Sequence, residues 1–224
     1  MSRVARILDR LEKHYGKRKP LPPAGAYEMV IYANCGYPAN DATCTKGFAE
    51  LKKRVGLQPD EILEASDIEL AACLRSGGIF PELRATRLKE IAARVENKYG
   101  GDLSGALRKT PAEAKKVLKQ FPTIGDPGAE KILLFTRTAP VMAVPSNCVH
   151  VPLRLGLGKA YKTYSKDYKS AQDALAAESP EDCDARLRAY LLLQHHGQEL
   201  CKRSRPKCEE CPVTADCRYF QSTQ

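Results

Sequence analysis

Four cysteines near the end of the chain constrain its fold more than any other feature. They are Cys201, Cys208, Cys211 and Cys217, and six, two and five residues separate them. Thiolates are soft ligands, and four of them meeting at one point bind zinc or an iron–sulfur cluster. A zinc site commonly pairs two Cys-x-x-Cys knuckles, whereas this segment has one such pair and two single cysteines on longer arms. The spacing suits the larger [4Fe-4S] core, and the chemistry alone leaves zinc as an alternative.

The other five cysteines lie far apart in the sequence. They are Cys35, Cys44, Cys73, Cys148 and Cys183. Residues 1–19 alternate charged and apolar residues, which is not the pattern of a signal peptide, so a disulfide framework is not expected. We expect these five to be small buried apolar side chains. No stretch approaches the roughly 20 apolar residues of a membrane span, so we expect a protein of the cytoplasm, associated with the nucleoid, or of a nucleus.

Apolar residues recur at helical spacing along most of the chain, without a sustained strand alternation. Two clear examples are Val4, Ile7, Leu8 and Leu11, and then Leu88, Ile91, Ala92 and Val95, a helix that Gly100 would stop. Thr110 and Glu113 form a capping box with proline at the first helical position. Ser179-Pro180 predicts another helix start by the same logic. The sequence therefore predicts an all-α fold.

The charge balance favours a polyanionic partner. Lysine and arginine number 36 against 27 acidic residues, a net charge of +9. A basic surface of this size is typical of nucleic-acid binding, although a soluble basic surface without a partner is equally compatible with it. Lys202, Arg203, Arg205 and Lys207 lie between the first two clustered cysteines. These four are candidates for contacts with phosphate groups, which would be electrostatic and independent of sequence.

Two segments carry a resemblance to a known family. The cysteine segment resembles the iron–sulfur loop of endonuclease III and the adenine glycosylases. The run from Phe121 to Ala129 is similar to the helix-hairpin-helix of the same superfamily, whose usual form is Leu-Pro-Gly-Val-Gly. In such a hairpin, a tight turn aims backbone N–H groups and a helix N-terminus at a phosphate. The corresponding DNA-binding positions here are Thr123, Ile124, Gly125 and Gly128.

The resemblance implies an architecture as well as a partner. It predicts two helical subdomains: residues 24–136 with the hairpin, and residues 1–23 with 137–224, which include the cluster loop 201–217. It also implies a DNA groove between them, a mainly structural [4Fe-4S] cofactor and a monomeric protein. Ile79 and Phe80 lie in a loop that resembles the family's strand-separating loop, where they could act as an apolar wedge; a buried connection between helices is the alternative.

The two catalytic positions of the family hold prolines in this chain. The lysine that attacks the sugar corresponds to Pro127, and the aspartate that stabilises the cationic transition state corresponds to Pro145. Proline supplies neither an amine nor a carboxylate, and Pro127 is a good first residue for a helix capped by Asp126. His150 and Asp41 are weak substitutes, and structural roles are simpler for both.

The residue that fills the gap left by a flipped base also differs, because the family's glutamine corresponds to Pro38. The sequence therefore predicts a DNA-binding [4Fe-4S] protein of the endonuclease III-like base-excision family, with standard glycosylase and lyase activity weak or absent. Two alternatives stay open. One is an active DNA glycosylase with non-standard catalytic residues, and the other is a redox or scaffold protein that uses the cluster.

Overall fold

The computed structural model describes residues 1–20, 23, 25–36 and 41–223, and these ranges contain helices and no strand. The prediction of an all-α fold is therefore confirmed. The chain divides into two compact units: unit 1 consists of residues 1–21 with 139–224, and unit 2 consists of residues 22–138. Within the described ranges, no helix has both the length and the apolar composition that a membrane crossing needs.

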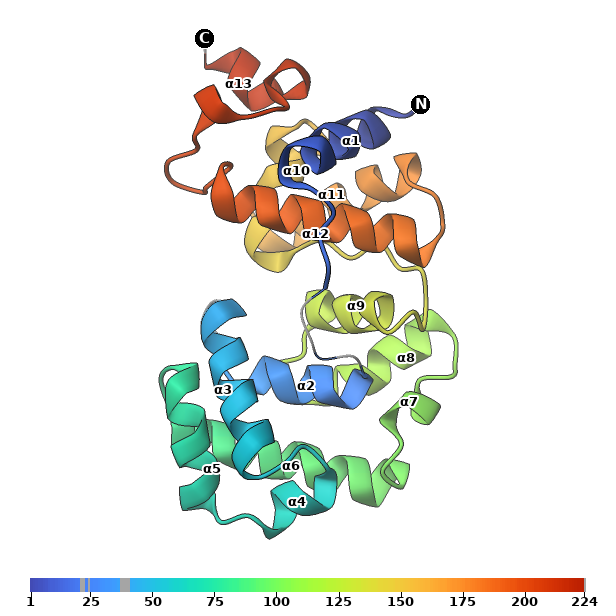
Figure 1. The fold of residues 1–224 in the computed structure, drawn as a ribbon. Coiled ribbons are helices and arrows are strands. Elements are labelled where there is room, and N and C mark those ends of the chain that lie inside the picture. Colours follow the sequence, from blue (N-terminus) through green and yellow to red (C-terminus); the bar gives the residue numbers. More distant parts are fainter. Residues whose placement is uncertain (21–22, 24, 37–40, 224) are drawn as a thin grey trace. The chain divides into compact units, whose positions relative to one another are not determined.

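Unit 1 joins both ends of the chain around one core. Its helices are α1 (Arg3–Tyr15), α10 (His150–Arg154), α11 (Tyr164–Glu178), α12 (Cys183–Glu199) and α13 (Arg218–Ser222), with short 3-10 turns η2 (Ser146–Cys148), η3 (Cys208–Glu210) and η4 (Thr214–Asp216). Helix α1 packs on α12 and α11, as Figure 1 shows. The predicted apolar face of residues 4–11 is buried, and Ser2 caps the helix through the backbone N–H of Ala5.

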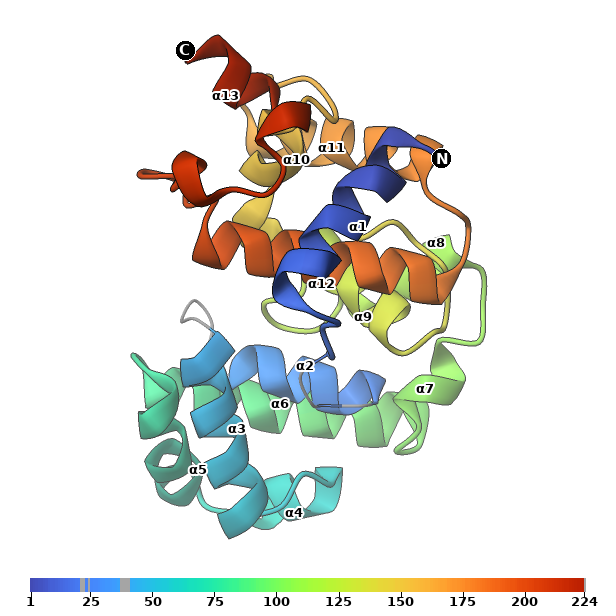
Figure 2. The same cartoon turned by 45° about the horizontal axis from the view of Figure 1, so that its top comes forward.

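Unit 2 is a continuous stretch of chain. Its elements are α2 (Ala26–Asn34), α3 (Asp41–Arg54), α4 (Pro59–Glu64), α5 (Asp67–Leu74), η1 (Arg75–Gly77), α6 (Pro81–Tyr99), α7 (Leu103–Ala106), α8 (Pro111–Leu118) and α9 (Asp126–Phe135). The long helix α6 contacts α2, α4 and α5 (Figure 2). Its predicted apolar face is buried, and Gly100 ends it in the left-handed conformation, as expected of a glycine stop.

Two predicted helix starts have different outcomes. The capping box of Thr110 and Glu113 is confirmed, with both reciprocal bonds present at the start of α8. The start at Ser179-Pro180 is wrong, because Ser179 instead ends α11. Helix α12 begins at Cys183, where the side chain of Asp182 accepts the backbone N–H of Ala185. The carboxylate of Asp182 thus provides the cap that the sequence pattern assigned to Ser179.

Candidate functional site

The four clustered cysteines follow α12 directly and lie in a loop that returns to the end of that helix. The backbone N–H of Cys201 donates to the carbonyl oxygen of His196 at 2.8 Å, and that of Lys207 donates to the carbonyl oxygen of Leu200 at 2.8 Å. Cys217 is buried, whereas Cys201 and the other two are half-buried. The first part of the loop is therefore bound to the end of α12, and its last cysteine is part of the buried core.

The thiols of this loop lie close enough to one another to affect each other's pKa. Burial is the main reason that the pKa of Cys211 is raised to about 11; the backbone hydrogen bond with Val213 opposes the rise, and the charges of Cys201, Cys217 and Cys208 add to it. Burial also raises the pKa of Cys201, while the nearby guanidinium of Arg154 lowers it. In the described chain, no three His, Cys, Asp or Glu side chains are arranged to hold a single metal ion. One zinc ion needs sulfur atoms only ~3.8 Å apart, since each Zn–S bond is ~2.3 Å long, whereas a cubane core holds its thiolates on separate iron atoms.

Arg154, at the end of α10, holds the first part of the loop. Its Nη1 donates to Cys201 Sγ at 3.6 Å and to the carbonyl oxygen of Lys202 at 2.8 Å, and its Nη2 donates to the carbonyl oxygen of Arg203 at 2.7 Å. The guanidinium also stacks over the ring of Tyr219, 4.7 Å from the centroid. A permanently charged group thus lies against one thiol and fixes the backbone beside it.

His196, on α12, lies against a second thiol. Its Nε2 is 3.7 Å from Cys211 Sγ, and its Nδ1 is 2.9 Å from the hydroxyl oxygen of Tyr15 on α1. The imidazole is almost fully buried, and this burial lowers the pKa of His196 to about 4, so the ring is neutral at physiological pH. A neutral imidazole offers one donor and one acceptor nitrogen, which matches these two neighbours.

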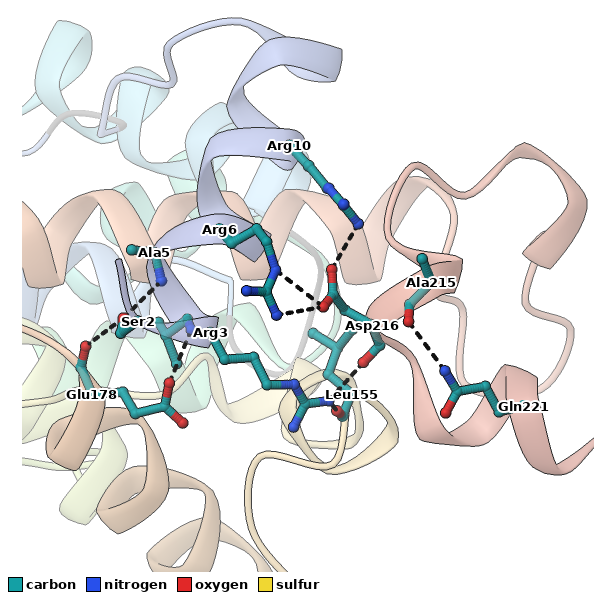
Figure 3. Close-up of polar contacts among 11 residues, drawn as sticks. Ser2, Arg3, Ala5, Arg6, Arg10, Leu155, Glu178, Ala215, Asp216 and Gln221 are labelled. Carbon is teal, nitrogen blue, oxygen red and sulfur yellow. Dashed lines mark hydrogen bonds and ion pairs between the residues drawn. The ribbon is translucent and has the colours of Figure 1, made fainter.

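The end of the loop is bound to the N-terminal helix through Asp216, the residue before Cys217 (Figure 3). The carboxylate of Asp216 pairs with Arg6 at 2.9 Å and with Arg10 at 2.7 Å. Arg3 donates to the backbone carbonyl of Asp216 at 2.6 Å and also to that of Leu155. Three arginines on one face of α1 therefore hold the last turn before the final cysteine.

His150 and Pro145, two positions singled out in the sequence, also lie in unit 1. His150 Nε2 is 2.7 Å from the carbonyl oxygen of Cys201, and its Nδ1 is buried without a described partner. Burial lowers the pKa of His150, with the carbonyl of Cys201 opposing the shift. Pro145 is buried and caps η2, its carbonyl accepting the N–H of Cys148 at 2.8 Å. His150 is thus turned to the cysteine loop.

The basic residues between the first two clustered cysteines are all exposed. They are Lys202, Arg203, Arg205 and Lys207. The Nζ of Lys207 is 3.8 Å from Glu210, a contact weak enough to leave the ammonium available to solvent. Arg154 holds the backbone carbonyls of Lys202 and Arg203, so the chain at these residues is fixed while the charged ends of their side chains face outward.

The hairpin of unit 2 lies between α8 and α9. The N–H of Ile124 donates to the carbonyl of Phe121 at 3.3 Å, and the side chain of Ile124 is buried. Thr123 has a φ of +64°, in the left-handed region that glycine adopts without strain. The usual family form has glycine at this position. This hairpin therefore keeps the backbone turn while it pays a conformational cost at Thr123.

The prediction that Asp126 caps α9 is wrong. The cap residue is Gly125, which makes no side-chain cap bond, and Asp126 is the first residue of the helix, so Pro127 is the second. The carboxylate of Asp126 instead pairs with Lys119 at 2.9 Å and with Lys115 at 3.1 Å, and these contacts lower its pKa, Lys119 most. Lys115 of α8 and Lys119, the residue that ends this helix, therefore take the carboxylate as a partner.

The loop before α6 exposes two apolar side chains. Ile79 is 62% exposed and Phe80 is 64% exposed, so neither is part of a buried connection. Phe80 has a φ of +55°, a strained conformation for a bulky residue. Beneath the loop, the buried guanidinium of Arg84 donates to the carbonyl oxygens of Cys35, of Leu74 at 2.9 Å and of Gly78 at 2.6 Å. Arg84 therefore supports the loop and is not a surface charge.

Asp41 is the first residue of α3, and its backbone carbonyl accepts the hydroxyl of Tyr32 at 3.1 Å. Burial lowers the pKa of Lys131 on α9, and the negative charges of Asp41 and Cys44 oppose this shift. Lys131 and Asp41 are therefore electrostatic neighbours in unit 2. Pro38, the position of the family's glutamine, lies outside the described residues.

Several residues that shape the cysteine loop were missed from the sequence. Arg154, His196, Tyr15 and Asp216 all touch it or its flanking turns. The sequence held a partial signal for two of them, since His196 precedes Cys201 by about one and a half helical turns and Asp216 is adjacent to Cys217. Arg154 and Tyr15 come from distant segments and left no local pattern.

Comparisons with curated proteins find a Thymine-DNA glycosylase and an Endonuclease III among the relatives of this chain. No protein-family model matches the sequence. The chain is 28% identical to the Thymine-DNA glycosylase of Aeropyrum pernix over 165 residues, which cover 73% of this chain and 70% of that protein. It is 25% identical to the Endonuclease III of Rickettsia felis over 223 residues, 97% of each chain. A match to Transcriptional activator DEMETER of Arabidopsis thaliana, at 25% identity over 73% of this chain, spans only 9% of that longer protein.

The fold is also similar to that of solved structures. A non-covalent Endonuclease III-DNA complex superposes with a TM-score of 0.78 at 20% sequence identity, covering 100% of this chain and 99% of that one. At this level of identity the likeness establishes a common fold along the whole chain.

Proposed function

Because this chain belongs to the endonuclease III-like helix-hairpin-helix superfamily of DNA glycosylases, we propose that it is a DNA-binding [4Fe-4S] protein with little of the family's usual excision chemistry. The proposal is carried by the two prolines, Pro127 and Pro145, that the resemblance of the sequence sets at the positions of the family's reacting lysine and aspartate. Pro127 is in the first turn of α9 and Pro145 caps η2, so each proline has a structural role at the start of a helix.

The cluster would be held by Cys201, Cys208, Cys211 and Cys217. The mutual electrostatic influence of these thiols, the donor from Arg154 and the contact with His196 support this assignment, because ligating thiolates are normally stabilised by such neighbours. A bound cluster supplies a covalent cross-link between the loop and the core, together with a one-electron redox centre. The residues around the thiols fix the loop and compensate negative charge.

DNA would contact two separate surfaces. On unit 1 the exposed side chains of Lys202, Arg203, Arg205 and Lys207 offer positive charge to phosphates. On unit 2 the hairpin offers backbone N–H groups at the start of α9, which has no side-chain cap. The carboxylate of Asp126 next to this helix start is paired with two lysines, which reduces its repulsion of a phosphate. Two features that resemble those of the family, the cysteine loop and the hairpin, are thus available for binding.

A second candidate function rests on Lys131 and Asp41. An amine whose pKa is lowered by burial and which lies near a carboxylate is the type of pair that excision and strand cleavage need. An active glycosylase with relocated catalytic groups is therefore the alternative. It is second because Lys131 also lies 5.3 Å from the ring of Phe135, an interaction that stabilises a structural lysine.

Binding and excision are measured on the same DNA duplexes. We expect binding to intact and abasic duplexes that weakens steeply with salt, and no base release above background under single-turnover conditions with oxidised pyrimidines, uracil or adenine mispairs. The double variant Arg203→Glu/Arg205→Glu should weaken binding at least tenfold. The matched control Lys52→Glu/Lys53→Glu makes the same charge change on exposed residues of α3. Salt-insensitive binding would refute the DNA contacts, and rapid excision that Lys131→Met abolishes would establish the alternative.

A further inference from the structure

A chain of three side chains links the N-terminal helix to one cysteine of the loop. Tyr15 is the last residue of α1, His196 is on α12 and Cys211 is in the loop. The hydroxyl oxygen of Tyr15 is 2.9 Å from His196 Nδ1, and His196 Nε2 is 3.7 Å from Cys211 Sγ. Both distances fall within the range of hydrogen bonds to these atom types, and the imidazole between them is almost fully buried.

If Cys211 is a thiolate ligand, the donor and the acceptor of each hydrogen bond among Tyr15, His196 and Cys211 are determined. A thiolate bound to a cluster has lost its proton and can only accept a hydrogen bond. His196 must then carry its proton on Nε2, leaving Nδ1 as an acceptor. A phenol keeps its proton at neutral pH, so the Tyr15 hydroxyl donates to Nδ1 and stabilises this tautomer. Tyr15 thereby keeps the proton of His196 on Nε2, from which it donates to Cys211 Sγ.

The position of Tyr15 is itself fixed from two sides. Its ring makes an edge contact with that of His195, with centroids 4.7 Å apart. Helix α1, which carries Tyr15, is held to the end of the loop by the ion pairs of Arg6 and Arg10 with Asp216. The hydroxyl is therefore a preorganised donor with little freedom to turn away.

Hydrogen bonds to the sulfur ligands affect an iron–sulfur cluster in a known direction. The reduced cluster carries one more negative charge, so a donor on a ligating sulfur stabilises the reduced form more than the oxidised form and raises the reduction potential. Arg154 places a charged donor on Cys201, 3.6 Å away. His196 places a neutral donor on a second ligand.

We propose that His196, oriented by the hydroxyl of Tyr15, is a positioning residue that sets the reduction potential of the cluster through its bond to Cys211. This inference rests on the cluster of the proposed function. It gives the N-terminal helix a role in the redox property of a site whose ligands all lie in the last part of the chain.

The test compares variants of the full-length protein after iron and sulfide have been measured. Tyr15→Phe keeps the ring and removes the hydroxyl donor, and His196→Leu removes the donor to sulfur. Both should lower the potential, and His196→Leu should change the equilibrium between the oxidised and reduced cluster at least tenfold, or about 59 mV for one electron. His196→Gln, which retains an N–H donor, should restore most of the difference. Tyr161→Phe is the matched control, because Tyr161 is 45% exposed and its N–H, not its hydroxyl, has the described bond.

Each outcome discriminates between the inference and the proposed function. Wild-type protein without iron and sulfide would refute the cluster, and the inference with it. Full iron content with an unchanged potential in Tyr15→Phe and His196→Leu would refute the inference alone. If His196→Leu fails to assemble a cluster, Tyr15→Phe decides, because this milder variant leaves the imidazole in place. If His196→Gln and His196→Leu lower the reduction potential of the cluster equally, the effect is due to packing and the proposal is overturned.

Discussion

Arg10 and Asp216 form an ion pair, Nη1 to Oδ2 at 2.7 Å, between residues that are 206 positions apart in the chain. Arg6 pairs with the other carboxylate oxygen at 2.9 Å, and the side chain of Asp216 is only 10% exposed (Figure 3). A carboxylate buried to this extent with two arginine partners positions the turn next to Cys217. The N-terminal helix is thus part of the structure that supports the cysteine loop.

Asp216→Asn should destabilise unit 1. The variant removes the negative charge but leaves both arginines in place, so we expect the free energy of unfolding to fall by about 1–3 kcal/mol, the range for lost hydrogen bonds to charged groups. Urea unfolding followed by circular dichroism measures the change. Asp173→Asn is the control, since Asp173 is 60% exposed and pairs with Lys169 on the surface, and its effect should stay within about 0.5 kcal/mol. Equal effects of the two variants would contradict a special role for Asp216.

Removing one proposed cluster ligand should remove the cofactor and weaken the fold. Wild-type protein should be yellow-brown with iron and sulfide in equal amounts, whereas Cys208→Ser should lose both and yield less folded protein, since metal binding stabilises the folded loop. Iron and sulfide assays with visible absorbance measure this. Cys183→Ser, a change of the same chemistry at the start of α12, should retain the colour. Colourless wild-type protein with one zinc per chain would contradict the cluster.

Under the proposed function, a carboxylate at Pro145 and an amine at Pro127 should give the protein the family's activities. Pro145→Asp places a carboxylate at the residue before η2, and we expect base excision to rise by about 100-fold or more over wild type. Pro127→Lys in the first turn of α9 should give a borohydride-trapped adduct with abasic DNA. Pro145→Asn and Pro127→Gln make matched backbone changes without the carboxylate or the amine and should remain inactive. Single-turnover assays measure both gains, and wild-type activity equal to that of the restored variants would show that the chemistry resides elsewhere.

Thr123→Gly should stabilise the hairpin. The left-handed conformation costs a residue with a side chain about 1–2 kcal/mol, and the greater freedom of glycine in the unfolded chain offsets part of this, so a net gain of about 0.5–1 kcal/mol is expected. Thr163→Gly is the control, because Thr163 precedes α11 with a φ of −130° and gains nothing from glycine. Urea unfolding measures both, and destabilisation by Thr123→Gly would show that the threonine side chain contributes more than its strain costs.

The features of the fold that depend on neighbouring residues could be predicted from the sequence. The apolar face at residues 4–11, the capping box at Thr110 and the glycine stop at Gly100 are confirmed because each depends on residues within a few positions of one another. The caps assigned to Asp126 and Ser179 are wrong for a common reason. A neighbouring element supplied a better partner for Asp126, and Asp182 supplied a better cap for the following helix.

Distant contacts left no such pattern. No local pattern shows that Arg84 is buried, with its guanidinium donating to the carbonyl oxygens of Cys35, Leu74 and Gly78. The roles of Arg154 and His196 depend on side chains that meet only after α10 and α12 have packed. The cysteine spacing could suggest a ligand set from the sequence, but the groups that compensate its charge are determined by tertiary structure.

The union of the two chain ends in unit 1 sets an order of events during synthesis. Unit 2 is one uninterrupted stretch, residues 22–138, and it is synthesised before residues 139–216 of unit 1. Helix α1 is synthesised before unit 2, yet its partner Asp216 follows unit 2 in the chain. Unit 2 can therefore fold while α1 still lacks this partner, and unit 1 can be completed only after residues 139–216 have been added.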